Sequence, residues 1–218
     1  MAKTMAAIGL SAASYNIKKE QNAPDLREGI LALPHGAISE ILGGRTSGRT
    51  AVAHSILATA SRAGEVCAVI DASSSFDPSS ALRSGADLGK LLWVQCNHRL
   101  DTAIKATDMI LHSGGFGVVL LDLCDVAPAA FNSVPLSYWY RFRLALEPTQ
   151  TTLLILAAHS VAKSCAIRQF TLQPSKVHWR GLAPFQTMEG LETQANSRKP
   201  VPGPEVELHV FDHTFAHI

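Results

Sequence analysis

One stretch of this chain constrains its fold more than any other. Residues 37–50 read AISEILGGRTSGRT, an apolar segment followed by a glycine-bearing loop and the start of a helical pattern. Gly43, Gly48 and Thr50 match the phosphate-binding signature G-x-x-x-x-G-K-[ST], and Arg49 stands where the signature has lysine. Glycine lets backbone N–H groups approach an anion closely, and a helix N-terminus adds partial positive charge. The stretch therefore predicts a strand, a phosphate-binding loop and a helix.

The loop is the centre of a predicted nucleotide site that would bind ATP with Mg²⁺. The hydroxyl of Thr50 would ligate the metal, and Arg49 would bring a forked guanidinium in place of a compact ammonium. Asp122 ends an apolar run, which makes it a second candidate for holding Mg²⁺, through water. A strand-terminal aspartate that caps a loop is the alternative. The predicted nucleotide-binding residues are Gly43, Gly44, Arg45, Thr46, Ser47, Gly48, Arg49, Thr50, Asp122 and His159.

Strand and helix patterns alternate along the rest of the chain. Apolar runs typical of buried strands lie at 65–72, 116–123 and 152–158, and a further strand pattern lies at 91–95. Helical patterns lie at 50–63, 79–84, 99–112 and 135–146. This alternation predicts an α/β fold with a mostly parallel central sheet flanked by helices. After Ser164, short strand patterns separated by Pro- and Gly-bearing turns predict a small antiparallel C-terminal β extension.

Composition places further limits on the chain. We expect a flexible arm at 1–28, a core at 29–164 and the β extension at 165–218. A net charge of +1 over 218 residues gives no general attraction to nucleic acid. The four cysteines lack the spacing of metal ligands. No apolar run is long enough to span a membrane, and we expect the protein in the cytoplasm. The extension does carry a local group of basic residues, either a DNA contact or a solvated face: Lys176, His178, Arg180, Arg198 and Lys199.

The segment YWYRFR at 138–143 has two interpretations. Aromatic residues and arginines together are typical of protein interfaces and of surfaces that stack on bases. Alternatively, Trp139 and Phe142 pack in the core of the domain.

Several motifs, in the same order, resemble the core of the bacterial RecA recombinase. The blocks are LPHGAISEILG at 33–43, the glycine loop, GEVCAVIDA at 64–72, FDP at 76–78, GADLGKLL at 85–92, VVLLD at 118–122 and TLLI at 152–155. They cover roughly residues 30–160. The resemblance implies a RecA-like P-loop core.

Four positions depart from what this resemblance implies. The family has a water-activating glutamate where this chain has Ser73, and serine cannot serve as a general base. The family stacks a tyrosine on the adenine where this chain has Ser80. A glutamine that senses the γ-phosphate is replaced by His159, which can still donate a hydrogen bond, and the loop lysine is Arg49. The resemblance with these departures implies a degenerate ATPase site and a protein that is not an enzyme.

A shortened RecA-like core with such losses and a β extension is similar to the ImuA family, described as related to the cell-division inhibitor SulA. The tail carries this likeness at 177–179, 189–191 and 198–199. It implies an accessory protein of damage-induced (SOS) mutagenic translesion DNA synthesis. Its partners would be an ImuB-like Y-family protein and an error-prone DNA polymerase, with RecA and DNA as further contacts. The loops after Asp122 and His159 are short where the recombinase has its DNA-gripping loops, so we expect no filament.

Two alternatives to this adaptor remain. One is an active DNA-dependent RecA-like ATPase of DNA repair, with Asp77 or Asp125 as the acid that activates water. The other is nucleotide binding without hydrolysis.

Overall fold

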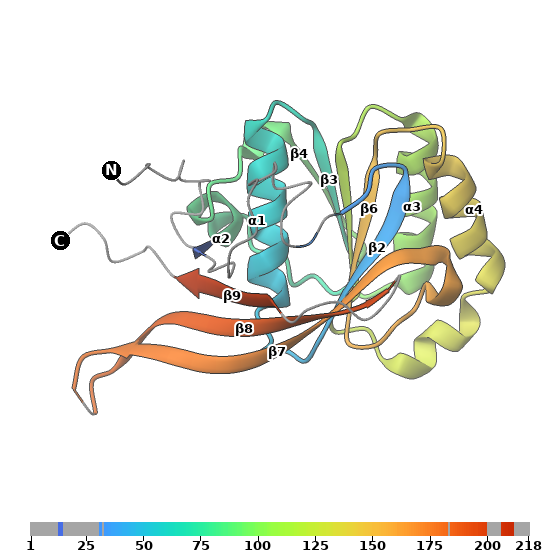
Figure 1. The fold of residues 1–218 in the computed structure, drawn as a ribbon. Coiled ribbons are helices and arrows are strands. Elements are labelled where there is room, and N and C mark those ends of the chain that lie inside the picture. The colour runs from blue at the N-terminus through green and yellow to red at the C-terminus, as the bar shows by residue number, and fades with distance from the viewer. Residues whose placement is uncertain (1–12, 15–30, 32, 183, 200–205, 212–218) are drawn as a thin grey trace.

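The computed structural model of the chain describes residues 13–14, 31, 33–182, 184–199 and 206–211 (Figure 1). The predicted arm at 1–28 lies outside these residues, except for Ala13 and Ser14. The strands are β1 (Ala13–Ser14), β2 (Ala37–Leu42), β3 (Cys67–Asp71), β4 (Leu91–Gln95), β5 (Val118–Asp122), β6 (Thr152–Ala157), β7 (Ala166–Arg180), β8 (Thr187–Lys199) and β9 (Val206–Phe211). The α-helices are α1 (Arg49–Arg62), α2 (Pro78–Arg83), α3 (Leu100–Ser113) and α4 (Leu136–Leu146), and 3₁₀ turns lie at Leu88–Lys90 (η1), Pro128–Ser133 (η2) and Lys163–Cys165 (η3).

All the described strands belong to one sheet, in the order β1-β9-β8-β7-β2-β6-β5-β3-β4. From β7 through β2 to β4 every neighbouring pair is parallel. The pairs β7–β8, β8–β9 and β1–β9 are antiparallel. The predicted fold class, a mostly parallel sheet with an antiparallel C-terminal extension, is confirmed. Because β7 pairs directly with β2, the extension continues the core sheet, and the boundary at residue 164 stays a prediction.

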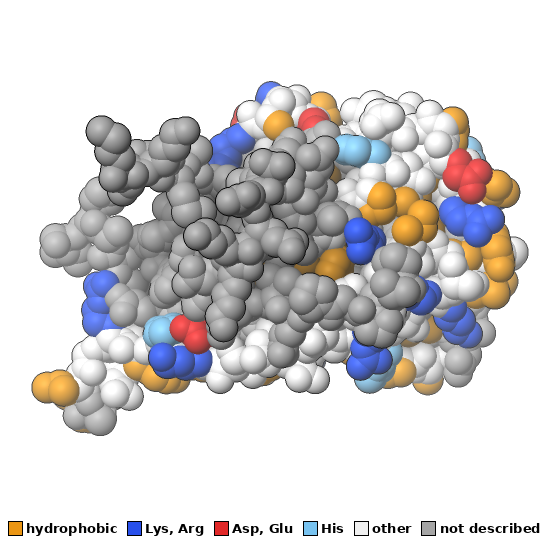
Figure 2. Space-filling view, in the orientation of Figure 1, with side chains coloured by type: hydrophobic (Ala, Val, Ile, Leu, Met, Phe, Trp, Pro, Cys, Tyr) orange, Lys and Arg blue, Asp and Glu red, His pale blue; other side chains and the backbone are white. Residues whose placement is uncertain are grey.

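The β7–β8 hairpin is longer than the strand beside it. Pairing between β2 and β7 ends at Thr171, whereas β7 continues to Arg180 paired only with β8 among the described residues. The hairpin therefore projects from the body of the molecule (Figure 1). Leu182 and Phe185 are exposed at its tip, where the space-filling view shows apolar side chains (Figure 2).

Helices cover both faces of the parallel part of the sheet. Successive side chains of a strand point to opposite faces, so strands buried on both sides are apolar throughout. Ile38 of β2 accordingly packs in the cluster that holds α3 and α4 residues, while Ile41 packs in the cluster that holds α1 and α2 residues. None of the described helices has the length and apolarity needed to cross a membrane.

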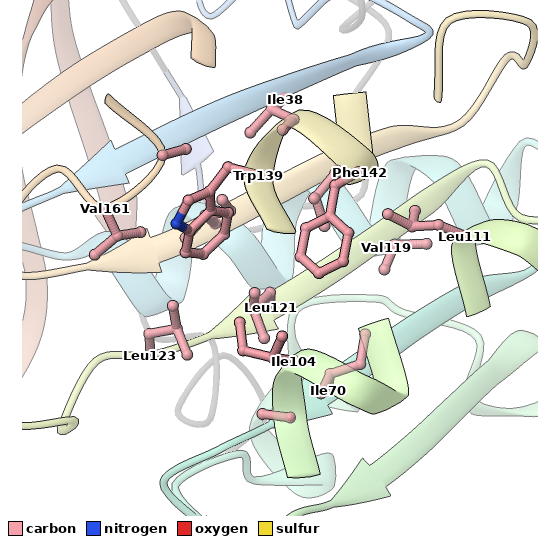
Figure 3. Packing of buried hydrophobic residues seen from close by; sticks show 14 of the residues in the cluster. Ile38, Ile70, Ile104, Leu111, Val119, Leu121, Leu123, Trp139, Phe142 and Val161 are labelled. Atoms are coloured by element: carbon pink, nitrogen blue, oxygen red, sulfur yellow. The ribbon is translucent and has the colours of Figure 1, made fainter. Parts of the chain in front are cut away.

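Helix α4 settles the interpretation of its aromatic residues. Trp139 and Phe142 are 2% and 0% exposed and pack edge to face, with ring centroids 5.7 Å apart (Figure 3). Of the two interpretations of this segment, the structure therefore supports the one in which Trp139 and Phe142 pack in the core. Leu136, Tyr140 and Leu144, spaced four residues apart on the same helix, remain exposed.

Parallel pairing brings the chemically interesting loops together. The glycine loop follows β2, and the loops after β3, β5 and β6 leave the same edge of the sheet. Asp71 and Asp122 are paired neighbours at the ends of β3 and β5. This edge is where open α/β sheets bind ligands.

Candidate functional site

The glycine loop adopts a compact conformation between β2 and α1. Gly48 has φ +80°, the left-handed region that side chains rarely adopt, and it directly precedes the first helical residue. A Cβ at Gly43 would lie 2.9 Å from the Leu172 carbonyl oxygen and would collide with the Ser47 side chain. Ser47 is buried, and its hydroxyl has no hydrogen-bond partner among the described residues. Both glycines are therefore required by the path of the backbone.

Arg49 turns into the loop and does not extend to solvent. Its side chain is 3% exposed, and its guanidinium donates hydrogen bonds to the carbonyl oxygens of Gly43 and Cys124, the latter at 3.1 Å. These bonds tie the loop after β2 to the loop after β5. A guanidinium has five N–H donors, so a positive charge with further donors remains beside the loop.

The start of α1 is the part of the site that best fits a phosphate. Within the part of the chain that the structure describes, no side chain caps this N-terminus and its first turn contains no acid, so its N–H groups and partial positive charge remain for an anion. Thr50 is exposed in this turn. Of the other predicted loop residues, Gly44, Arg45 and Thr46 are exposed. Arg45 also forms an ion pair with Asp125, at 2.9 Å.

Two buried aspartates occupy the neighbouring strand ends. Asp71 accepts backbone hydrogen bonds from Ser73, Ser75 and Phe76, at 3.0–3.1 Å, and so shapes the loop after β3. Asp122 accepts from the Cys124 N–H and the Ser75 hydroxyl. Burial, and to a smaller extent the nearby Asp71 carboxylate, raises the pKa of Asp122 above its usual value. A divalent cation bound here would offset both effects.

The groups that could activate water are engaged elsewhere. Ser73 stands at the position of the family's glutamate, and its hydroxyl accepts the Asp125 N–H at 3.2 Å. Asp77 caps α2 by accepting the N–H groups of Ser79 and Ser80. The Ser80 hydroxyl, followed by these backbone bonds, lowers the pKa of Asp77, which makes it a weaker base. The described residues thus fit the phosphate end of a nucleotide, whereas Ser73 is no general base and Ser80 offers no ring to stack on an adenine.

The contacts of His159 do not include the glycine loop among the described residues. In the described part of the chain it makes no hydrogen bond to that loop. It lines a cavity beside α4, together with Lys163 and apolar side chains. Its predicted contact with a γ-phosphate stays a prediction.

Sequence reasoning missed a buried carboxylate in the middle of β2. Glu40 is 0% exposed and accepts four hydrogen bonds at 2.7–2.8 Å, from the Ser160 hydroxyl, the Val161 and Ala162 N–H groups and the Gln169 side-chain amide. It therefore holds the loop after β6 against β2 and β7. The available signal was an acid inside an otherwise apolar strand, which burial makes costly unless it is hydrogen-bonded.

Sequence reasoning also missed contacts between the β extension and the glycine loop. The Thr193 hydroxyl on β8 lies 2.8 Å from the Ser47 carbonyl oxygen and 2.9 Å from that of Gln173. A Cβ placed on Gly48 would be 3.2 Å from Leu191. The extension thus forms one wall of the candidate site.

Comparison with known proteins identifies the family. The family model described as the RecA N-terminal domain matches residues 13–131, more than half of the chain. The chain belongs to the RecA family. The RecA proteins of Acinetobacter baylyi and Chloroflexus aurantiacus are both 37% identical to it, over 98 and 100 residues. These matches cover 45% and 46% of this chain but 28% of either relative, so the chain matches little more than a quarter of their length.

A solved structure supports the fold over a longer range. The crystal structure of the RadB recombinase superposes on 86% of this RecA-family chain and on 94% of its own chain, with a TM-score of 0.60. The sequence identity is 13%, so this likeness concerns the fold alone.

Proposed function

We propose that this RecA-family chain is an ImuA-like accessory protein of damage-induced mutagenic translesion DNA synthesis. It would act in the cytoplasm as a non-filamenting adaptor between an ImuB-like Y-family protein and an error-prone DNA polymerase, with RecA and DNA as further contacts. One observation carries the proposal: Ser73 stands where the base would be, and the neighbouring acids are engaged, Asp71 and Asp77 in structural hydrogen bonds and Asp125 in an ion pair with Arg45. An adaptor needs the folded core but not the water-activating group.

Phosphate release from ATP tests the loss of catalysis. We expect the purified chain, with or without single-stranded DNA, to release phosphate no faster than its Thr50→Ala and Asp122→Asn variants. The reason is that none of the described loop residues is placed as a free general base. Steady turnover that both substitutions abolish would establish the active ATPase instead.

Nucleotide binding without hydrolysis is favoured as a second function by the uncapped start of α1 and the buried charge of Arg49. A ligand that binds only the folded state stabilises it by about 2.7 kcal/mol at a hundredfold excess over Kd. We expect ATP to raise the melting temperature without phosphate release, and Arg49→Ala to reduce that rise. An ATP-independent melting temperature in the native chain would exclude nucleotide binding.

Co-purification tests the adaptor role directly. We expect the tagged full chain, recovered from cells with damaged DNA, to bring with it a Y-family-like protein and an error-prone polymerase. The matched control is the same recovery from undamaged cells. Recovery of the chain from damaged cells without any polymerase would refute the adaptor role.

A further inference from the structure

A cavity beside α4 is formed where two loops leave the edge of the sheet. Its volume is about 210 Å³, and its walls come from the loop after β5, the loop after β6 and the start of α4. Its apolar lining includes Val126, Phe131, Val134, Leu136 and Val161. A cavity of about 150 Å³ lined by such side chains can hold a benzene ring. This cavity therefore has room for one aromatic or branched apolar group.

The inner end of the cavity is continuous with the core. Trp139 and Val161 line the cavity and also belong to the core cluster, part of which Figure 3 shows. The buried carboxylate of Glu40 accepts the Val161 N–H at 2.8 Å. The 3₁₀ turn η2 begins with the lining residue Pro128, whose ring restricts the backbone. These contacts restrain two segments of the wall.

The rim of the cavity carries one ammonium group, that of Lys163. Lys163 and His159 are exposed lining residues, and none of the described residues that line the cavity is acidic. Lys163 has φ +50°, and the Lys199 ammonium donates to its carbonyl oxygen, so its backbone is held at the rim. An apolar group that carries an anion beside it would match both the lining and the rim.

The lining favours a protein segment over a nucleic acid. Base stacking needs open ring faces along a groove with several cations. Here Trp139 is 2% exposed and Phe131 is packed against the core, while the remaining apolar walls are aliphatic. A pocket lined by the buried Trp139, by Phe131 and by aliphatic side chains suits the single anchor side chain of a protein interface.

We propose that this cavity docks one apolar side chain from an acidic segment of a partner protein. The choice of a protein partner rests on the proposed adaptor function, while the chemistry of the ligand comes from the cavity itself. The apolar side chain would lie against the apolar lining of the cavity, and carboxylates beside it would pair with the Lys163 ammonium.

Methyl NMR spectra of the full chain, with labelled Val and Leu, test the proposal with two probes. One probe is a set of short synthetic peptides in which Phe or Leu is flanked by Asp and Glu, with the same peptides carrying Lys as control. The other probe is oligothymidylate. We expect the acidic peptides to shift the methyl signals of Val126, Val134, Leu136 and Val161, and the basic peptides to shift none of them.

Matched variants separate docking from folding. Leu136→Ser should weaken peptide binding about tenfold, because it removes an apolar wall, whereas Leu144→Ser on the same helix lies outside the cavity and should change nothing. Lys163→Asn should weaken binding about threefold to tenfold and reduce its salt dependence, whereas Lys105→Asn should not. Unchanged melting temperatures in Leu136→Ser and Lys163→Asn would confirm that both remain folded.

Three outcomes would overturn the proposal. Shifts caused by oligothymidylate and not by acidic peptides would make this a nucleic-acid site. Shifts with neither probe would show that the cavity docks neither ligand. Polymerase recovery from damaged cells that is equal for Leu136→Ser and the native chain would place the docking surface elsewhere and leave the adaptor function standing. Conversely, peptide binding without any recovered polymerase would refute the adaptor function alone.

Discussion

Glu40 offers the most direct test of how the loop after β6 is held. The Glu40→Gln substitution keeps the size of the side chain and removes its charge. The remaining amide oxygen can still accept from the Val161 and Ala162 N–H groups, but those two bonds become neutral. Bonds to charged groups contribute about 1.5–3 kcal/mol and neutral ones about 0.5–1.5 kcal/mol. The free energy of unfolding should therefore fall by about 2 kcal/mol.

Glu40→Leu removes the acceptor altogether and should lower the free energy of unfolding more than Glu40→Gln does. It leaves two buried N–H groups and the Gln169 amide without this partner. Each unsatisfied buried donor costs about 1–3 kcal/mol, so a loss of about 4 kcal/mol or more is expected. The control is Glu147→Gln, because Glu147 is exposed and its ion pair in the described part of the chain is a long one, with Arg143 at 3.5 Å. It should change stability by less than about 0.5 kcal/mol.

Urea unfolding and amide hydrogen exchange measure these effects together. Glu40→Gln should lower the urea midpoint and speed exchange at Val161 and Ala162, while the amides of β5 stay protected. A change below about 0.5 kcal/mol, with native exchange rates at those two amides, would refute the assigned role of the carboxylate.

Three further perturbations follow from the structure. Burial lowers the pKa of His54 from 6.5 to about 4, so as pH falls the unfolded chain binds a proton that the folded chain does not. Relative to the His54→Leu variant, the free energy of unfolding of the native chain, measured with urea, should fall by about 2 kcal/mol between about pH 7 and about pH 5. An equal pH dependence of this free energy in both proteins would contradict the pKa shift. Thr193→Val removes the donor to the Ser47 carbonyl and should cost about 1–2 kcal/mol in urea unfolding, with faster exchange in the glycine loop; an unchanged midpoint would refute the contact. Gly48→Ala forces a Cβ into a left-handed conformation 3.2 Å from Leu191 and should cost about 1–3 kcal/mol by thermal unfolding, whereas a stable variant would mean that the loop adopts another path.

The parallel core could be predicted from the sequence because its signals are local. The buried strands β3, β5 and β6 are almost entirely apolar, and the patterns for β4 and β6 end within a residue of their predicted positions. The glycine loop is also a local signal, because Gly48 has a left-handed backbone and a Cβ on Gly43 would collide with the nearby Ser47.

The parts that were missed depend on contacts distant in sequence. Glu40 meets donors about 120 residues later in the chain, and Thr193 meets the loop 146 residues earlier. No local pattern encodes such pairs, because they form only when β7 and β8 reach the sheet. The hydrogen bond from Arg49 to the Cys124 carbonyl could not be predicted either, because it also joins residues distant in sequence. The motif specifies the type of a residue and not the direction of its side chain.

Beyond Thr171, the edge of β7 that faces away from β8 has no partner strand among the described residues, and this has a consequence for solubility. An open strand edge presents backbone groups to which a second chain can add, and this is a route to aggregation. Pro174 lies in that stretch and has no N–H to offer, the register with β8 shifts between Pro174 and Lys176, and Lys176 adds an exposed charge. Proline, bulges and lysine are the features by which natural sheets discourage such growth. These features discourage a second copy of the chain from adding a strand to the projecting hairpin.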